Sequence, residues 1–161
     1  SFLSTDSTKF RGTSTTDFTI GTNGDMNTNG KEYIAYLFAH DPLGASGDGS
    51  DGMIACGSYV GNGSADGTEI DLGWEPQYVI VKPTTVSDDW RVFDNIRGVT
   101  TTGNDNILKA NSSGAETNTD NVLEFNSTGF KLTTTNNNGN GSGQTYIYMA
   151  IRRGMSVCSG A

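Results

Sequence analysis

Residues 130–149 read FKLTTTNNNGNGSGQTYIYM, in which two stretches of strand-forming residues flank a loop of Asn, Gly and Ser. Aromatic and β-branched residues favour strands, and Asn and Gly favour the turns that join them. An earlier stretch, residues 18–36, reads FTIGTNGDMNTNGKEYIAY and has the same plan. The two stretches correspond at these positions: Phe18 and Phe130, Ile20 and Leu132, Gly30 and Gly143, and Tyr33-Ile34 and Tyr146-Ile147. The chain therefore contains parts of two copies of one β-unit.

This repetition predicts the domain organisation. Residues 53–152 are expected to form one complete β-sandwich unit, and residues 1–41 the C-terminal part of a preceding unit. Residues 42–52, rich in Asp, Gly and Pro, are predicted to be a linker. Residues 153–161 are predicted to begin a following unit. As an alternative, residues 1–41 could fold back and add strands to the main sandwich. A tandem array of large β-units is typical of an extended surface protein.

The composition favours an all-β fold. Gly numbers 22, and Gly, Asn and Asp suit the tight turns between strands. Charged residues make up only 17% of the chain, which disfavours a disordered segment rich in charge. Clusters of Val, Ile, Tyr, Phe and Thr alternate with turn signals, as in a sandwich of many short strands. We therefore predict an antiparallel β-sandwich.

Within the complete unit, the clearest predicted strand is 77–83, where successive residues alternate and Pro83 ends the run. The predicted strands are 53–60, 68–72, 77–83, 90–94, 106–110, 121–126, 129–135 and 144–151. A short helical turn is predicted near Asn95–Gly98. Before this unit, residues 17–39 are predicted to form a hairpin. Its second strand, Tyr33–Ala39, is apolar enough to be buried on both faces.

Aromatic side chains supply the predicted core of the sandwich. They are Trp74, Tyr78, Trp90, Phe93, Phe125, Phe130, Tyr146 and Tyr148. Trp90 has an alternative role because it follows an acidic loop, and an exposed indole there could stack on a sugar ring. Trp90, Asp88 and Asp89 are therefore the candidate ligand-binding residues.

The charge balance bears on partners. The formal net charge is −8, whereas nucleic-acid binding needs clustered Lys and Arg. The only basic pair is Arg152-Arg153. No apolar run reaches the length of about 18 residues needed for a transmembrane helix. We therefore expect neither a nucleic-acid partner nor membrane insertion.

Acidic residues on one predicted strand can be compared with the carboxylate pattern of enzymes that hydrolyse glycans. Glu69 and Asp71 fit the first two carboxylates of the E-x-D-x-E pattern of retaining β-glucanases, which need paired carboxylates across the scissile bond. The third position falls on Gly73 or Trp74, and Glu75 comes one residue too late. No Ser–His or Cys–His pattern for nucleophilic catalysis is present either. We predict that the chain is not an enzyme and that these carboxylates face solvent.

One loop resembles the start of an oxygen-rich calcium loop, with Asp25, Asn27 and Asn29 at alternate positions before Gly30. The bidentate carboxylate expected later is missing, since that position is Tyr36. The matching loop of the second copy, 138–143, has no carboxylate. A hairpin turn is therefore the preferred interpretation. Calcium is the single cofactor candidate, and no other is expected.

The two cysteines occupy equivalent places in successive copies, because Met53–Cys56 is echoed by Met155–Cys158. Equivalent places lie one unit apart, so a disulfide between Cys56 and Cys158 is not the default expectation. A small buried side chain on a strand is the simpler interpretation. The single histidine, His40, lies near neither cysteine in sequence, so a metal or catalytic role has little support.

Several segments in combination resemble a domain of tail-fibre and other structural proteins of marine phages, of the cyanophage and pelagiphage type. They are GSYVGNGSADGTEIDLGWEPQYVIVKPT (57–84), DDWRVFDNIRG (88–98), NDNILKANSSGAE (104–116), FNSTGFKL (125–132) and TYIYMAIRR (145–153). The YIAYLFAHD segment, followed by a Gly/Asp linker and MIACGSYVGNG, resembles the junction between tandem copies. The resemblance implies a sandwich of the concanavalin-A-like or jelly-roll type, and it transfers no catalytic residues. Pro83 departs from the pattern, because such sequences often continue there with a charged residue.

The expected function is a structural or adhesive module of a phage virion, placed in a tail fibre as a spacer or host-attachment domain. The alternatives are a lectin-like module that binds host glycans, a capsid decoration protein, and a glycan hydrolase completed by a distant carboxylate. The resemblance implies a location on the virion surface, outside the cell. The expected partners are other virion proteins, copies of the chain itself in a homotrimer, and host-surface glycans.

Overall fold

The structure is a computed structural model that describes residues 9–14, 16–41, 52–99 and 102–154. The chain divides into two compact units, Ser1–Leu37 and Phe38–Ala161, which we describe separately. Most of the predicted linker and the start of the predicted following unit lie outside the described residues. Among the described residues, no helix is long and apolar enough to cross a membrane.

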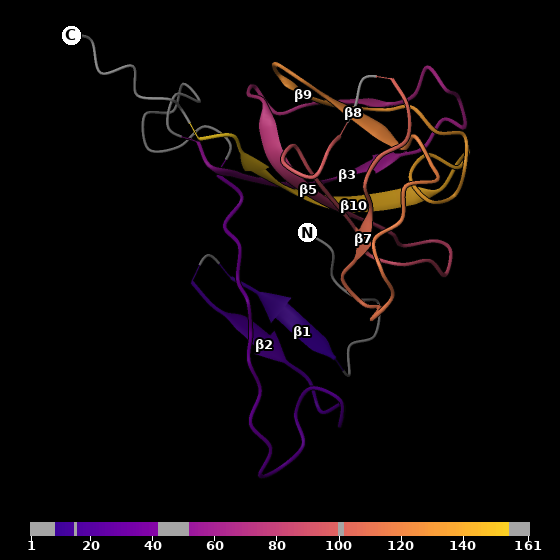
Figure 1. Cartoon of the computed structure of the whole chain (residues 1–161). Helices are drawn as coiled ribbons and strands as arrows, with labels where there is room; N and C mark the ends of the chain where they lie inside the picture. Colours follow the sequence, from indigo (N-terminus) through magenta and orange to yellow (C-terminus); the bar gives the residue numbers. More distant parts are fainter. Residues whose placement is uncertain (1–8, 15, 42–51, 100–101, 155–161) are drawn as a thin grey trace, which may run out of the picture. The chain divides into compact units, whose positions relative to one another are not determined.

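The first unit contains one antiparallel hairpin, β1 (Phe10–Thr13) and β2 (Phe18–Ile20), which forms a two-stranded sheet of its own (Figure 1). A loop over residues 21–33 follows, and the chain then continues to residue 40 without regular secondary structure. β1 and β2 join neither sheet of the second unit, and the alternative that residues 1–41 complete the main sandwich stays a prediction.

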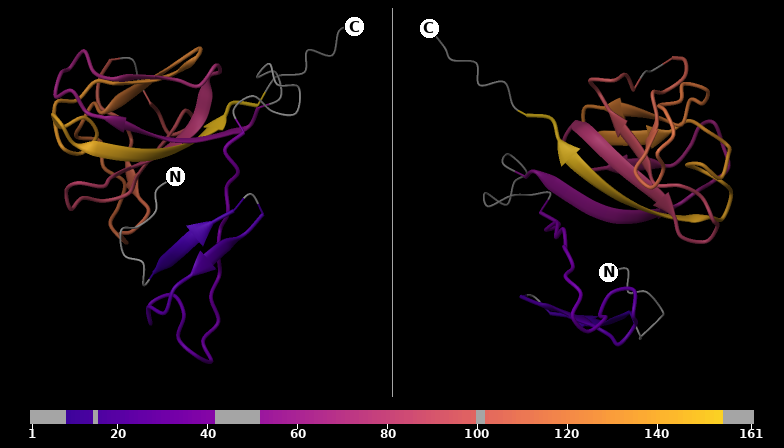
Figure 2. Two further views of the ribbon diagram at one scale, coloured as in Figure 1. Left: turned by 180° about the vertical axis from the view of Figure 1, so that it is seen from behind. Right: turned by 60° about the horizontal axis from the view of Figure 1, so that its bottom comes forward.

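The second unit is a two-layer antiparallel β-sandwich (Figure 2). Its larger sheet has the strand order β3-β10-β5-β6-β7, so the long strand β10 is central and pairs with both β3 and β5. These strands are β3 (Ile54–Val60), β5 (Pro76–Pro83), β6 (Arg91–Asp94), β7 (Leu108–Lys109) and β10 (Thr145–Arg152). The smaller sheet has the order β4-β9-β8, with β4 (Glu69–Asp71), β8 (Leu123–Asn126) and β9 (Gly129–Leu132).

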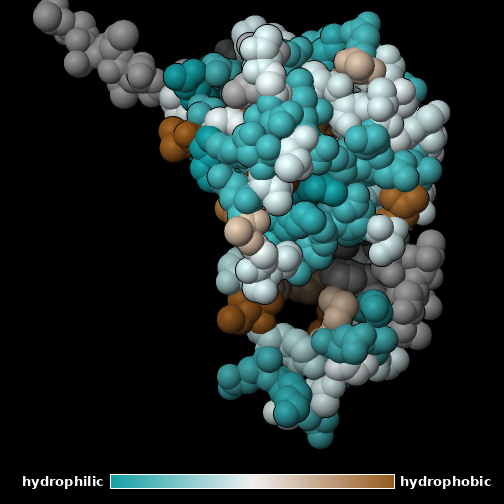
Figure 3. Space-filling model, turned by 45° about the vertical axis from the view of Figure 1, so that its right-hand side comes forward, coloured by the Kyte–Doolittle hydropathy of each residue, from teal (hydrophilic) through white to brown (hydrophobic). Residues whose placement is uncertain are grey.

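Alternation along the strands builds the core between the two sheets. In β5, Val79 and Val81 are buried on the face toward the smaller sheet, as the period of two requires. Facing them, Leu123, Phe130 and Leu132 of β8 and β9 are fully buried. The face of the molecule seen in Figure 3 is mostly hydrophilic, with its apolar side chains in small separate patches.

The all-β antiparallel sandwich predicted from the sequence is confirmed. All eight predicted strands of the complete unit occur, although β7 keeps only two of the five predicted residues. The predicted helical turn is a hydrogen-bonded turn at residues 95–97, where Asp94 accepts bonds from the Ile96 and Arg97 amides at 3.1 and 2.8 Å. Among the described residues there is no helix.

Half of the predicted aromatic core is fully buried, namely Trp74, Phe93, Phe130 and Tyr146. Phe125 and Tyr148 are partly buried and pack against that core. Tyr78 and Trp90 are also only partly buried.

The prediction that Tyr33–Ala39 is a strand buried on both faces is wrong for the described structure. Residues 31–40 form no strand, and all ten side chains are exposed. The large apolar side chains among them are between 49% and 83% exposed: Tyr33, Ile34, Tyr36, Leu37 and Phe38. The sequence pattern correctly indicated apolar character. Burial on two faces also requires neighbouring strands, and no strand of the described residues pairs with this segment.

Candidate functional site

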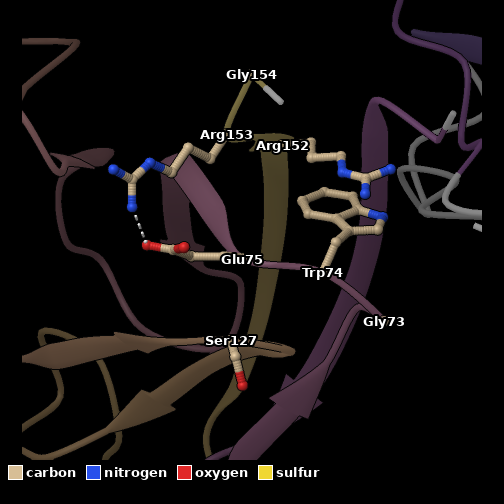
Figure 4. A pocket seen from close by; sticks show the side chains of 7 residues that line it. All are labelled: Gly73, Trp74, Glu75, Ser127, Arg152, Arg153 and Gly154. Carbon is tan, nitrogen blue, oxygen red and sulfur yellow. Dashed lines mark hydrogen bonds and ion pairs between the residues drawn. The ribbon is translucent and has the colours of Figure 1, made fainter. Parts of the chain in front are cut away.

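A surface cavity of about 270 Å³ lies where β10 ends beside the turn between β4 and β5 (Figure 4). Its lining residues are Gly73, Trp74, Glu75, Ser127, Arg152, Arg153 and Gly154. The turn is shaped by Gly73, whose φ of 76° is a left-handed conformation, and by Asp71, which accepts a hydrogen bond from the Gly73 amide at 2.9 Å. The Arg153 amide donates to the Glu75 carbonyl at 2.9 Å and so holds the two walls together.

The two arginines of this cavity play different parts. Trp74 is only 2% exposed, and Figure 4 shows the Arg152 guanidinium beside its indole ring, an arrangement suited to cation–π attraction. Arg153 instead points to Glu75, with an Nη1 to Oε1 distance of 2.9 Å. This ion pair is exposed, so it adds little to stability. Both guanidinium groups of the cavity therefore already have partners within the chain, and the buried indole cannot serve as a platform for a sugar.

The predicted ligand-binding loop lies at the start of β6. Asp88 receives two hydrogen bonds from the Arg91 guanidinium, at 2.9 and 3.1 Å, and both side chains are largely buried. Asp89 pairs with Lys109 Nζ at 2.8 Å and accepts a bond from Asn111 Nδ2 at 3.0 Å. The hydrogen bonds from Lys109 and Asn111 hold the pKa of Asp89 below its usual range.

These contacts give both carboxylates a structural role. The Trp90 amide also donates to Asn111 Oδ1 at 2.9 Å, so the loop is tied to the chain that follows β7. The Trp90 side chain is partly exposed and stays available to a ligand. Binding by Trp90, Asp88 and Asp89 stays a prediction.

The carboxylates tested for hydrolysis lie on β4, where Glu69 and Asp71 are exposed and Ile70 between them is buried. Glu69 Oε1 accepts a hydrogen bond from Asn126 Nδ2 at 2.9 Å. Asp71 shapes the turn at Gly73, and Glu75 pairs with Arg153. The three acidic groups therefore each have a separate local partner, which agrees with the predicted solvent-facing stripe.

The candidate calcium loop is held by its own hydrogen bonds. Asn27 Nδ2 donates to the Gly21 carbonyl at 2.8 Å, and Asp25 lies 3.7 Å from Lys9 Nζ. Gly30 has a φ of 74°, as the turn requires. Among the described residues, no group of three or more His, Cys, Asp or Glu side chains could hold a metal ion. Calcium binding by Asp25, Asn27 and Asn29 stays a prediction.

The loop at residues 21–33 and the loop at residues 134–146 have the same hydrogen bonds at corresponding positions. In the first loop, the backbone bonds are Met26 N to Asn23 O (3.2 Å), Asn27 N to Asn23 O (2.9 Å) and Lys31 N to Thr28 O (3.2 Å). In the second loop, the corresponding bonds are Gly139 N to Asn136 O (3.3 Å), Asn140 N to Asn136 O (2.9 Å) and Gln144 N to Gly141 O (3.1 Å). Gly143 has a φ of 72°, close to that of Gly30. The sequence likeness between the two stretches is thus also a likeness of backbone geometry.

Side chains repeat in the same way. Asn140 Nδ2 donates to the Thr134 carbonyl at 3.0 Å, as Asn27 donates to Gly21. Each loop is also closed by a tyrosine hydroxyl. Tyr33 Oη donates to Gly24 O (3.2 Å) and accepts from Thr28 N (2.9 Å), and Tyr146 Oη donates to Asn137 O and accepts from Gly141 N (both 2.9 Å). The asparagine that suggested a metal ligand is therefore a loop-organising amide in both places.

The two loops differ in what covers them. Asn140 is fully buried, because residues 61–64 lie against its loop and exchange hydrogen bonds with its amide. Asn27 is exposed, and among the described residues its side chain bonds to the Gly21 carbonyl alone. The first loop thus has the form of the second without its covering segment.

Cys56 and His40, which are distant in sequence, are neighbours in the second unit. The Cys56 amide donates to His40 Nδ1 at 3.0 Å, beside an isolated bridge between Asp41 and Ile54. Cys56 is partly buried, and burial raises the pKa of its thiol. Both facts fit the structural interpretation of this residue. Cys158 lies outside the described residues.

Sequence reasoning missed two structural residues. Asn140 organises its loop through its side-chain amide, and its match to Asn27 in the first stretch was the sequence signal that could have indicated this role. Asp105 is fully buried and accepts bonds from the Val122 and Leu123 amides at 2.7 and 3.1 Å. It lies among turn residues, so the sequence carries no sign that this carboxylate is buried.

Comparison with protein families matches residues 2–153 to a family described as a domain of unknown function, DUF7483. No curated protein and no solved structure matches the chain.

Proposed function

The chain belongs to the DUF7483 family, and on that premise we propose that it is a structural and adhesive module of a phage virion, built into a tail fibre as a spacer or host-attachment domain. The virion setting is supported by the resemblance of its segments to marine phage fibre domains. The modular role is supported by the repeated loop within the chain.

One observation carries the modular part of this proposal. The segment that follows the first loop begins with Tyr33-Ile34, which match Tyr146-Ile147 of the central strand β10. Its apolar side chains are nevertheless exposed, and it pairs with no strand among the described residues. Monomeric proteins seldom expose contiguous apolar surface of this kind. A unit that repeats the loop of the sandwich and leads into a complete sandwich is the arrangement expected of a link in a series.

The mechanism that follows is mechanical and multivalent. Each sandwich is a rigid layer pair with its core between the sheets, so a series of them holds a tip away from the particle. Weak contacts between the side of such a fibre and a cell surface add up when several copies engage together. Trp90, which is partly exposed and follows Asp88 and Asp89, is the candidate side chain for such contacts, because aromatic rings stack on sugars.

The virion setting is tested by immunogold electron microscopy with antibodies against residues 53–152. We expect gold particles along the tail fibres of purified virions whose genome carries this sequence. Labelling of the capsid would favour the decoration alternative. Absence of label, together with absence of the chain from the virion proteins by mass spectrometry, would contradict the proposal.

Adhesion is tested on a glycan array with the whole chain. We expect selective binding that falls by about tenfold or more in Trp90→Ala, the effect of losing an aromatic contact at the centre of a binding site. Tyr36→Ala is the matched control, since it removes another exposed aromatic side chain. Equal binding by all three proteins would count against Trp90. Loss of binding on calcium removal would support a calcium role for Asp25, Asn27 and Asn29.

A further inference from the structure

We propose that residues 21–39 form a docking site for residues 53–85 of another copy of this unit. The inference rests on the repeat organisation in the proposed function and goes beyond it by naming the partner segment and its contacts. In the second unit, residues 53–85 supply β3 and β5, the two strands that flank β10. The first unit has counterparts of the loop before β10 and of β10 itself, but the described residues place no strand beside them.

The contacts at the loop give the first step. In the second unit, Gly61 N donates to Gln144 O at 2.9 Å, and Gly63 N donates to Asn140 O at 2.8 Å. Gly143 N donates to Gly61 O at 2.9 Å. The corresponding groups of the first loop are Lys31 O, Asn27 O and Gly30 N. Because the first loop has the same backbone geometry, these three groups point to where a second Gly61–Gly63 segment would bind.

An amide pair adds specificity to this contact. Asn62 N donates to Asn140 Oδ1 at 3.0 Å, and Asn140 Nδ2 donates to Asn62 Oδ1 at 2.8 Å. Asn27 has the same place and the same internal bond as Asn140. Its amide is therefore oriented to make the same reciprocal pair with an incoming Asn62.

A close approach of the two backbones restricts the partner further. A side-chain carbon at Gly61 would lie 2.4 Å from the Gly141 carbonyl oxygen, so only glycine fits there. Thr28 takes the place of Gly141 in the first loop. The docking segment must therefore present glycine at this point, as GSYVGNG does.

Tyrosine stacking gives the next step. Tyr59 stacks on Tyr146 with ring centroids 4.9 Å apart and an interplanar angle of 10°, and Tyr59 Oη donates to the Gly139 carbonyl at 2.7 Å. Tyr33 is the counterpart of Tyr146 and has the same hydroxyl bonds, but it is 49% exposed. An incoming Tyr59 would cover this ring.

The strand segment completes the site. β10 is covered on both edges by β3 and β5 through antiparallel pairing along its length. Strand addition to residues 34–39 would give their backbone groups hydrogen-bond partners and would cover Ile34, Leu37 and Phe38. The exposed apolar side chains of residues 34–39 would then contact the apolar side chains that β3 and β5 of the second copy supply.

The test uses the whole chain labelled with ¹⁵N and an unlabelled synthetic fragment of residues 53–85 that carries Cys56→Ser. We expect saturable chemical-shift changes at residues 21–39, slower amide exchange at residues 34–39, and little change in β10. Asn27→Ala in the chain should weaken binding by about tenfold or more, because it leaves Asn62 of the fragment without its partner. A fragment with Gly61→Val should not bind, and this control leaves the chain itself unaltered.

The inference is overturned if the fragment causes no shifts at residues 21–39, or if it binds equally well with Gly61→Val. It is also overturned if residues 34–39 are already protected in the free chain, since the chain would then cover this segment itself. These results are separate from the virion test, because labelled tail fibres with no fragment binding would leave the proposed function standing and remove only the docking site.

Discussion

Replacing Asn140 with alanine is expected to lower the free energy of unfolding of the sandwich by about 3 kcal/mol, because several buried polar groups lose their partner together. The Asn140 amide is fully buried and joins the Thr134 and Ser64 carbonyls to Asn62 through bonds of 2.8 to 3.0 Å. For a domain of this size, the melting temperature should fall by roughly 10 °C or more.

Asn27→Ala is the matched control in the same chain. Asn27 has the corresponding place but is exposed, so its removal should change the free energy of unfolding of the sandwich by less than about 0.5 kcal/mol. Urea unfolding followed by tryptophan fluorescence reports on the sandwich, because Trp74 and Trp90 both lie in it. Equal losses for the two variants would contradict the structural account of Asn140.

The main sandwich could be predicted from the sequence because its strands carry their own signals. Residues 77–83 alternate in character. The central strand of the larger sheet directly follows a loop rich in Asn, Gly and Ser, which are typical turn residues. The weakest prediction was 106–110, of which only Leu108–Lys109 is a strand. There the sheet ends, and an edge strand can be short because only one neighbour fixes its length.

The error at Tyr33–Ala39 has a different origin. Sequence patterns report what a segment is suited to, and this segment is suited to the centre of a sheet. Whether it is buried depends on strands that pair with it, and these need not belong to the described residues. For the same reason, the repetition could be recognised in the sequence, whereas the lack of paired strands beside residues 33–39 could not.

The candidate site was harder to predict than the fold. Asp88 and Asp89 were recognised as an acidic loop beside a tryptophan, but their pairing with Arg91 and Lys109 depends on strand order. The cavity at Trp74 combines the β4–β5 turn with the end of β10, which are far apart in sequence. Arg152 was noted as part of a basic pair, and only the fold places it beside an indole.

The second large effect concerns hydrogen exchange of the backbone amides. It bears on the central claim that residues 33–39 resemble the central strand β10 in sequence but have no paired strand among the described residues. The amides of β10 pair with β3 or β5, so their exchange should require opening of the sandwich and be slowed by about 10⁴-fold or more for an ordinary domain stability. No backbone hydrogen bond from residues 34–39 is found within the described residues, so these amides should exchange at nearly the rate of an unfolded chain.

The most direct measurement is therefore amide exchange by NMR on the free chain, with residues 34–39 compared with residues 147–152, their counterparts in β10. The account predicts that the first set exchanges within the dead time of the experiment while the second stays protected for hours. Comparable protection of the two sets would contradict it, because residues 34–39 would then already have a partner within the chain.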